Sequence, residues 1–462
     1  MSAATLTRPP PTHASQAVRR PTESQHDNGS LDHMHRKRKR QKKSRYPPPF
    51  TQKVGLAAQV YGLQGLLGTA TWFQGWREWL YPPGGGPNIV KAYEVRPSFG
   101  VRIFFPVSYD LTSPQTLPTV FSIHGGGFCL GAARDDDEWN RAFADSQEML
   151  VISLPYSKAP RAPFPAALHD LESLYLAVLS DESLPIDRTS VAVLGYDAGG
   201  NLALGLSQLL AMRKNTVFPS AAVSISGYLD LERSAAEKSQ NRPYRADLLP
   251  WPRNGTVDPL ASTHEAYVWG YTPYGHDLRD PLLSPAYATW TDEDGAGASG
   301  AGRGGQGGRS GGLPQHVCLV GAELDMLAHE SWRLACRLVR DGGVKRGDGQ
   351  YEKWRVPDPD ADDLSEKICG RGQSGQGEMD QKADDGLSLR HRSGFEVRWA
   401  NTGSASPDGS VKWILVPDEL HGFDRVVASR AGATQLQPAQ HRDTNACVGE
   451  IGEWLRETVW GI

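Results

Sequence analysis

The chain has 462 residues, of which 39% are hydrophobic and 22% charged, and its formal net charge is -4. This length fits one large α/β domain with appendages, and the composition excludes a fibrous protein, a disordered acidic protein and a wholly basic nucleic-acid-binding protein. Five cysteines without a CxxC pair predict neither a disulfide framework nor a cysteine zinc cluster. They are Cys129, Cys318, Cys336, Cys369 and Cys447. This usage is typical of a reducing setting, so we expect an intracellular, cytoplasmic protein.

The chain begins with a segment rich in Pro, Ser, Thr and His that has no apolar signal core, so no secretory signal is predicted. Between Arg36 and Arg45, eight of ten residues are Arg or Lys. Such a block serves as a nuclear-import signal, as a patch for anionic lipid or as a solvated tail, and these alternatives stay open. We expect residues 1–50 to form a disordered basic tail.

The next stretch is apolar but glycine-rich. From Val54 to Trp76 it carries no formal charge, yet four glycines before Thr69 and three glutamines keep its hydropathy below that of a membrane span. We predict that residues 51–87 form a helix that packs over an active site as part of a cap or lies at a membrane surface. Nuclear targeting or association with a membrane surface would then depend on residues 36–76.

From about Asn88 short apolar runs alternate with longer helical patterns, which predicts a mostly parallel central sheet flanked by helices. The predicted core strands are Thr119 to Ile123, Leu150 to Leu154, Val191 to Leu194, Ala221 to Ile225, His316 to Val320 and Lys412 to Val416. The predicted helices are Phe164 to Leu179, Leu202 to Met212, Glu330 to Val339 and Asn445 to Thr458.

Two polar, glycine-rich stretches interrupt this alternation, residues 291–312 and 341–410, and we expect both to be flexible insertions outside the core. The first contains a literal GxGxxG at Gly302, Gly304 and Gly307. No strand pattern precedes it and no helix pattern follows, so it does not predict a dinucleotide site.

The chemistry is indicated by two glycine-rich turns. In IHGGGF, Ile123 to Phe128, consecutive glycines after a predicted strand let backbone amides point into a cavity, where such donors stabilise an oxyanion. In GYDAGGNLAL, Gly195 to Leu204, a tight strand-to-helix turn has Asp197 at its centre. Gly195 and Gly199 flank this position because the turn strains the backbone and leaves no room for larger neighbours.

Two further residues follow predicted strands. Asp325 lies just beyond the strand that ends near Val320, and His421 lies just beyond the strand that ends at Val416. The chain order of elbow residue, acid and histidine is that of a hydrolase triad on an α/β sheet. We therefore predict that Asp197, Asp325 and His421 converge on one cavity.

The motifs together resemble the hormone-sensitive-lipase-like branch of the α/β-hydrolase fold. The set consists of HGGGF, PYSKAPRAPFPAALHD, GYDAGGNLAL, DPLLSPAYA, AELDMLAHE and HGF, and the resemblance covers roughly residues 88–460 outside the two insertions. It implies an α/β-hydrolase fold with a helical cap. The cap would consist of residues 52–81 and an insertion at about residues 229–275.

The resemblance also implies roles for individual residues. The amides of Gly126, Gly127 and Ala198 would form an oxyanion hole, His421 would be the general base and Asp325 would orient it. His124, Gly125, Gly195 and Gly199 support the two glycine motifs. The aromatic residues of the cap would favour a small lipophilic substrate with an apolar acyl or ring group. They are Tyr244, Trp251, Tyr267, Trp269, Tyr271 and Tyr274.

The chain departs from the family pattern at the elbow, where the family has serine and this sequence has Asp197. A carboxylate cannot perform ordinary acyl-serine chemistry. We predict a hydrolase of small carboxylic esters in which Asp197 and His421 act on water. Two alternatives stay open, an Asp-nucleophile hydrolase of the epoxide or haloalkane type and a pseudoenzyme that binds a small lipophilic ligand. We expect no cofactor, no metal and no nucleic-acid partner, and the sequence leaves the oligomeric state open.

Overall fold

The computed structural model describes residues 46–80, 85–213, 216–240, 259–290, 312–341, 393–399, 409–416, 419–423 and 438–462. All of them belong to one compact unit, Lys42–Ile462. The basic block Arg36–Arg45, Tyr244, Trp251 and most of both expected insertions lie outside the described residues.

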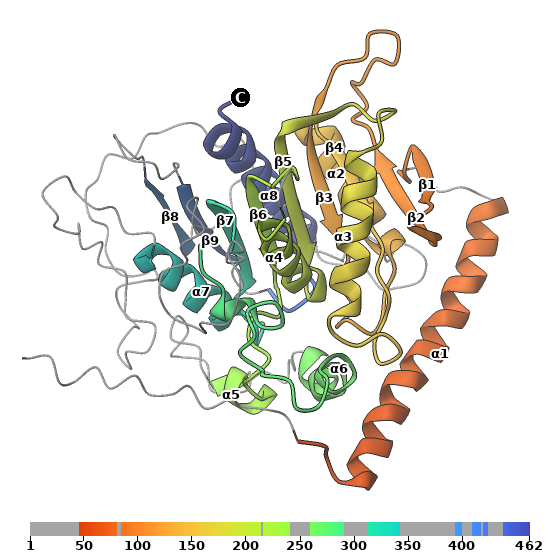
Figure 1. Cartoon of the computed structure of the whole chain (residues 1–462), viewed down its shortest axis with the longest axis vertical. Coiled ribbons are helices and arrows are strands. Elements are labelled where there is room, and N and C mark those ends of the chain that lie inside the picture. The colour runs from red at the N-terminus through yellow and green to blue at the C-terminus, as the bar shows by residue number, and fades with distance from the viewer. Residues whose placement is uncertain are drawn as a thin grey trace, which may run out of the picture. The chain divides into compact units, whose positions relative to one another are not determined.

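The strands of the described ranges form one nine-stranded sheet in the order β1-β2-β4-β3-β5-β6-β7-β9-β8 (Figure 1). The strands are β1 (Ile89–Tyr93), β2 (Arg96–Phe104), β3 (Leu117–Ile123), β4 (Leu150–Leu154), β5 (Ile186–Tyr196), β6 (Ala221–Ile225), β7 (His316–Ala322), β8 (Ser393–Trp399) and β9 (Gly409–Val416). From β4 to β9 all neighbours pair in parallel, whereas β1, β2 and β8 pair antiparallel at the two edges. The predicted mostly parallel sheet is confirmed.

Helices cover both faces of this sheet. They are α2 (Asp137–Gln147), α3 (Ala166–Leu179), α4 (Ala198–Ala211), α7 (Ala328–Asp341) and α8 (Pro438–Glu453), the last continuing into a π-helical segment, Trp454–Trp460. Helices α3, α4 and α7 pack on one face, and α2 and α8 pack on the other (Figure 1). Along β5, Val191 and Val193 face the first group while Ala192 and Leu194 face the second. Both faces are apolar because both are covered, as in other parallel sheets.

The predicted strands and helices are present, with ends that differ by a few residues, whereas β1, β2 and α2 were not predicted. The expectation that residues 341–410 lie outside the core is wrong for residues 393–399. These residues form β8, which pairs with β9, and Phe395 and Val397 pack against the core. Their alternation with Glu396 and Arg398 is the period of a half-buried strand, which the surrounding polar sequence obscures.

Three further helices are α1 (Phe50–Leu80), α5 (Ala235–Gln240) and α6 (His264–Tyr271). Helices α5 and α6 lie beyond the carboxyl ends of the parallel strands, and α1 runs from there along the β1 edge of the sheet (Figure 1). The side-chain nitrogen Nε2 of Gln64 in α1 donates to the backbone oxygens of Cys129 and Ala159, each at 2.8 Å. Gln59 donates to the backbone oxygen of Ser262, just before α6, at 2.9 Å. These bonds hold α1 alongside α6 (Figure 1). Within the described ranges no helix has an apolar stretch sufficient to cross a bilayer.

Candidate active site

The predicted site residues follow the carboxyl ends of four parallel strands. Asp197 comes directly after β5, and Gly126 and Gly127 come shortly after β3. Asp325 follows β7 and His421 follows β9, and their loops are joined by the bond from the Leu324 amide to the Glu419 oxygen at 2.9 Å. The carboxyl ends of parallel strands share one edge of the sheet, so the topology brings these residues together.

The turn at Asp197 is held in a strained conformation by close backbone packing. Asp197 has φ 51° and ψ -118°, and it immediately precedes α4. A Cβ atom on Gly195 would lie 2.1 Å from the Gly199 oxygen, and one on Gly199 would lie 2.0 Å from the Ile123 oxygen. Both positions therefore require glycine, as the predicted strand-to-helix turn does. Ala198, the third expected donor, is the buried first residue of α4.

The glycine turn after β3 places two backbone amides on the carboxylate of Asp197. Gly126 and Gly127 have φ values of +116° and +57°, which suit glycine. Their amides donate to Asp197 Oδ2 at 2.7 and 2.8 Å. Hydrogen bonds from two amides to an ionised oxygen are strong. The Asp197 carboxylate therefore lies where these amides would otherwise bind the oxygen of a ligand.

The imidazole of His421 lies between two carboxylates. Its Nδ1 is 2.9 Å from Asp325 Oδ2, and its Nε2 is 3.4 Å from Asp197 Oδ1. Asp325 is fully buried, and its other oxygen accepts the Leu327 amide at 2.8 Å. Burial acts to lower the pKa of His421, but the charges and hydrogen bonds of Asp325 and Asp197 outweigh it and raise this pKa well above its usual value. This shift favours the protonated imidazole, whose Nδ1 donates to Asp325 and whose Nε2 faces the Asp197 carboxylate.

The glycine turn after β3 is also held by contacts of His124, the residue that precedes it. The His124 ring stacks on Tyr156 with ring centroids 4.4 Å apart, and its Nδ1 lies 2.7 Å from the Gly125 oxygen. Its Nε2 lies 2.9 Å from Lys158 Nζ. Because the carbonyl accepts at Nδ1, the neutral ring accepts the Lys158 hydrogen bond at Nε2. Burial lowers the pKa of Lys158 to about 7, and the charges of Asp135 and Asp170 partly oppose this effect.

Lys158 is a site residue that the sequence reasoning missed. It lies within the run PYSKAPRAPFPAALHD, in the loop that follows β4, and a lysine shortly after a buried strand is a signal that could have been followed. Its side chain lines the same cavity as Asp197.

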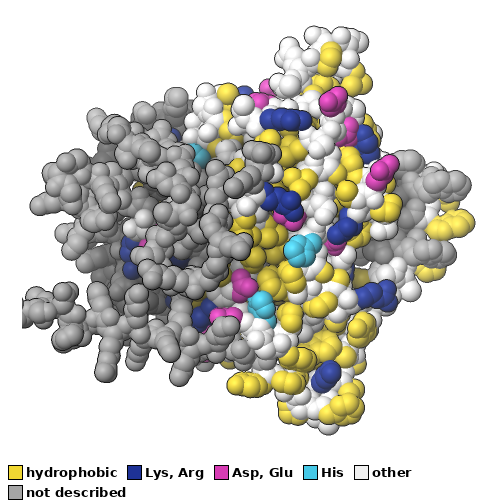
Figure 2. All heavy atoms as spheres, viewed as in Figure 1, with side chains coloured by type: hydrophobic (Ala, Val, Ile, Leu, Met, Phe, Trp, Pro, Cys, Tyr) yellow, Lys and Arg dark blue, Asp and Glu magenta, His cyan; other side chains and the backbone are white. Residues whose placement is uncertain are grey.

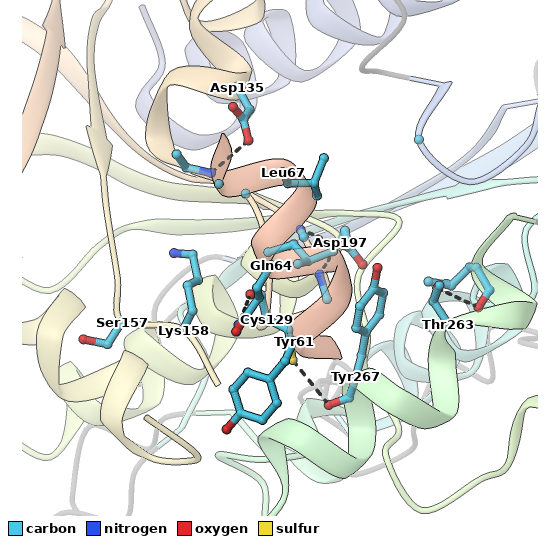
Figure 3. Close-up of a pocket in the computed structure, with 18 of the residues that line it drawn as sticks. Tyr61, Gln64, Leu67, Cys129, Asp135, Ser157, Lys158, Asp197, Thr263 and Tyr267 are labelled. Carbon is cyan, nitrogen blue, oxygen red and sulfur yellow. Dashed lines mark hydrogen bonds between the residues drawn. The ribbon is translucent and has the colours of Figure 1, made fainter. Parts of the chain in front are cut away.

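A cavity of about 1180 Å³ opens above the carboxylate. It is lined by Tyr61, Gln64 and Leu67 of α1 on one side and by Tyr267 of α6 on another, with Asp197 between them (Figure 3). The Tyr267 ring lies against Gly127, where an added Cβ would be 2.2 Å from the ring.

The aromatic residues expected to line a cap have different roles in the structure. Among those that the structure describes, Tyr267 lines the cavity, whereas Tyr271 stacks on Phe128 in the core at 3.8 Å. Trp269 donates to the Tyr274 hydroxyl at 2.8 Å. In the described ranges no cluster of three or more His, Cys, Asp or Glu side chains is arranged to hold a metal ion.

This geometry agrees with comparisons against known proteins. Residues 120–347 match a family model described as alpha/beta hydrolase fold. An arylesterase of Saccharolobus solfataricus is 31% identical over 243 residues, which are 52% of this chain and 67% of the relative. The chain belongs to the α/β-hydrolase fold family. The family and the fold that the motifs predicted are thereby confirmed.

Other relatives of this α/β-hydrolase are matched over shorter stretches. An acetyl-hydrolase of Streptomyces hygroscopicus is 34% identical over 37% of this chain and 52% of the relative. An arylacetamide deacetylase of Oryctolagus cuniculus is 30% identical over 34% of this chain and 39% of the relative. The match thus spans about half or less of these two proteins. A solved esterase from Pyrobaculum calidifontis has a TM-score of 0.53 at 18% identity, covering 89% of this chain and 99% of its own, which shows the shared fold.

Proposed function

We propose that this α/β-hydrolase cleaves small lipophilic carboxylic esters by direct attack of water, without an acyl-enzyme. The observation that carries the proposal is the position of His421, whose Nδ1 is held by Asp325 and whose Nε2 faces the elbow beside the Gly126 and Gly127 amides. A base, its orienting acid and two oxyanion donors thus meet at one cavity. The names of the relatives, arylesterase and acetyl-hydrolase among them, point to the same class of reaction.

The resemblance places a serine at the elbow, so Asp197 removes the covalent step. An ionised carboxylate is a weak nucleophile toward an ester and would form a mixed anhydride. In the proposed reaction the Asp197 side chain turns out of the two amides and the ester carbonyl oxygen takes its place. His421 in its neutral form removes a proton from water as the water oxygen bonds to the carbonyl carbon. The tetrahedral intermediate then expels the alcohol oxygen, which takes the proton from His421.

Electrostatics set the conditions for this reaction. The charges of Asp325 and Asp197 raise the pKa of His421, so the base is formed only as the pH rises through that raised pKa. The amides of Gly126 and Gly127 are available only when Asp197 has left them. Both requirements make turnover slow, with residual rates about a thousandfold or more over water when the nucleophile of such a site is missing.

The test compares nitrophenyl acetate hydrolysis by wild type, His421→Ala and Asp197→Ser. We expect wild-type turnover above buffer that increases with pH and is lost in His421→Ala. Asp197→Ser should be much faster, because a serine there gains a proton acceptor in His421 and an unoccupied pair of amides. An inactive wild type beside an active Asp197→Ser variant would overturn the proposal.

An inactive wild type beside an active Asp197→Ser variant would support ligand binding without turnover. One observation favours this alternative. Asp197 Oδ2 already accepts both amides, and the protonated His421 neutralises its charge, so the carboxylate resembles a bound product acid. In this case phenylacetone, a ketone that cannot be hydrolysed, should raise the melting temperature of the wild type. An unchanged melting temperature at saturating phenylacetone would argue against it.

The same carboxylate geometry also favours an Asp-nucleophile hydrolase. If Asp197 attacked a saturated carbon through Oδ1, the amides on Oδ2 would stabilise the oxyanion when water later attacks the Asp197 ester carbon. Ester formation would also remove one of the charges that keep His421 protonated, leaving it able to activate that water. Mass spectrometry of His421→Gln after incubation with styrene oxide would then find the peptide of Asp197 heavier by one epoxide. An unmodified peptide would exclude this chemistry.

A further inference from the structure

We propose that the exposed apolar face of α1 binds a membrane surface that contains anionic lipid, beside the mouth of the cavity. The inference names the surface from which the proposed lipophilic substrate arrives, and in this respect it rests on the proposed function. The binding itself is argued from α1 alone.

Helix α1 concentrates the exposed apolar side chains of the protein. Of the seventeen large hydrophobic side chains that are exposed in the described ranges, eight lie on this helix. Leu66, Phe73 and Trp76 have exposed fractions of 66%, 68% and 57%. In the space-filling view, hydrophobic side chains also gather at the lower end of α1, where the helix begins (Figure 2). Large apolar patches on a protein surface mark sites of contact with another surface.

These side chains share one side of the helix. Leu66, Phe73, Trp76 and Leu80 follow each other at intervals of seven, three and four residues, the spacing of one helical face. The opposite side faces the domain, where Val60 is fully buried and the Gln64 side chain donates to the backbone oxygen of Cys129. Helix α1 therefore has a second apolar face, whose large side chains are more than half exposed.

The charge pattern favours a lipid surface over a second copy of the chain. No charged residue occurs from Val54 to Trp76, and the block Arg36–Arg45 that precedes the helix has eight basic residues in ten. A second copy would add a block of the same charge, whereas an anionic membrane supplies the opposite charge. Lys and Arg side chains next to such a membrane are attracted to its anionic headgroups. Tyr and Trp side chains, here Tyr61 and Trp76, are suited to the boundary between headgroups and acyl chains.

The cavity opens next to this face. Tyr61 and Leu67 both line the cavity and are exposed, at 52% and 42%, so they lie at its rim. A lipophilic ester dissolved in the bilayer would enter between α1 and α6 without crossing bulk water. The geometry thus joins membrane contact to substrate access through a single helix.

The test is co-sedimentation of the full chain with vesicles of phosphatidylcholine, with and without phosphatidylserine. A double variant, Phe73→Ser with Trp76→Ser, removes two apolar side chains from α1. The matched control, Val107→Ser with Leu111→Ser, removes two apolar side chains that are 83% and 80% exposed in the loop after β2. All four side chains are exposed, so both variants should keep the wild-type melting temperature.

We expect the wild type to bind the vesicles with phosphatidylserine, more weakly as salt is added, and the α1 variant to bind about tenfold more weakly or worse. The control variant should bind like the wild type. Absence of wild-type binding, or equal binding by both variants, would overturn the proposal. So would a wild-type dimer in light scattering that the α1 variant abolishes without any vesicle binding. Turnover of soluble nitrophenyl acetate is measured separately, so loss of activity and loss of membrane binding are distinguishable.

Discussion

The elbow around Asp197 and the helix α1 above it are held in place by different kinds of contact. At the elbow the backbones of β3, β5 and α4 approach so closely that an added Cβ would lie about 2 Å from a carbonyl oxygen. On α1, Gly55, Gly62, Gly65 and Gly68 have nothing within 4 Å of such an atom. The elbow is thus positioned by close backbone packing, whereas the helix that lines the cavity is attached through side chains such as Val60, Gln59 and Gln64, so we expect α1 to open more easily than the elbow.

The largest expected effect is at the elbow. Gly199→Ala should lower the free energy of unfolding by about 4 kcal/mol, because the new methyl group meets the backbone oxygens of Ile123 and His124. Gly62→Ala, the matched change on α1, should raise it by about 0.5 kcal/mol, since alanine favours a helix more than glycine does. Urea denaturation of both variants measures the difference. Equal effects at the two positions would show that the elbow is not packed as described.

The next effect is electrostatic and depends on pH. The pKa of His421 is raised in the folded protein, so its interactions stabilise the fold fully below its unfolded value of 6.5 and are lost as the pH rises through the raised pKa. His421→Gln should therefore be less stable than wild type by about 3 kcal/mol at mildly acidic pH, with the gap closing at alkaline pH. Thermal melts across pH measure this gap.

A second variant tests whether the two carboxylates cause this difference in stability between wild type and His421→Gln. Asp197→Asn removes one of the two carboxylates on His421, so in this background the effect of His421→Gln should disappear at a lower pH. A gap that does not change with pH in either background would contradict the protonated imidazole.

Sequence patterns predicted those parts of the molecule that follow from general rules of residue spacing and strand order. The parallel strands, the glycine turns and the convergence of Asp197, Asp325 and His421 follow from apolar runs, glycine spacing and strand order, and the structure has all of them. Strand β8 was missed because its few apolar positions lie within a long polar segment. Its pairing partner, β9, is what makes it a strand.

The state of the site could not be predicted from the same patterns. That Asp197 Oδ2 accepts the Gly126 and Gly127 amides depends on a side-chain rotamer, which motif spacing does not encode. The contact of Lys158 with His124 joins two loops that lie 34 residues apart in the chain. The attachment of α1 through Gln64 reaches across 65 and 95 residues. Such contacts need the folded chain.

A smaller effect is expected where α1 is attached. Gln64→Ala removes two hydrogen bonds and leaves the oxygens of Cys129 and Ala159 without this donor, which should cost about 1 to 2 kcal/mol. We expect α1 to separate without unfolding the sheet, so the loss should appear as faster amide hydrogen exchange in residues 56–68. The exchange of β5 should not change. Faster exchange in β5 as well would mean that α1 and the sheet unfold together.

The smallest effect distinguishes the two glutamines of α1. Gln59 donates one exposed hydrogen bond to the Ser262 oxygen, so Gln59→Ala should cost no more than about 0.5 kcal/mol, measured by the same exchange experiment. The two variants remove the same side chain from neighbouring turns of one helix, so helix propensity and length are matched. A larger effect of Gln59→Ala than of Gln64→Ala would show that α1 is fixed mainly at Ser262, next to α6, and not at Cys129 and Ala159.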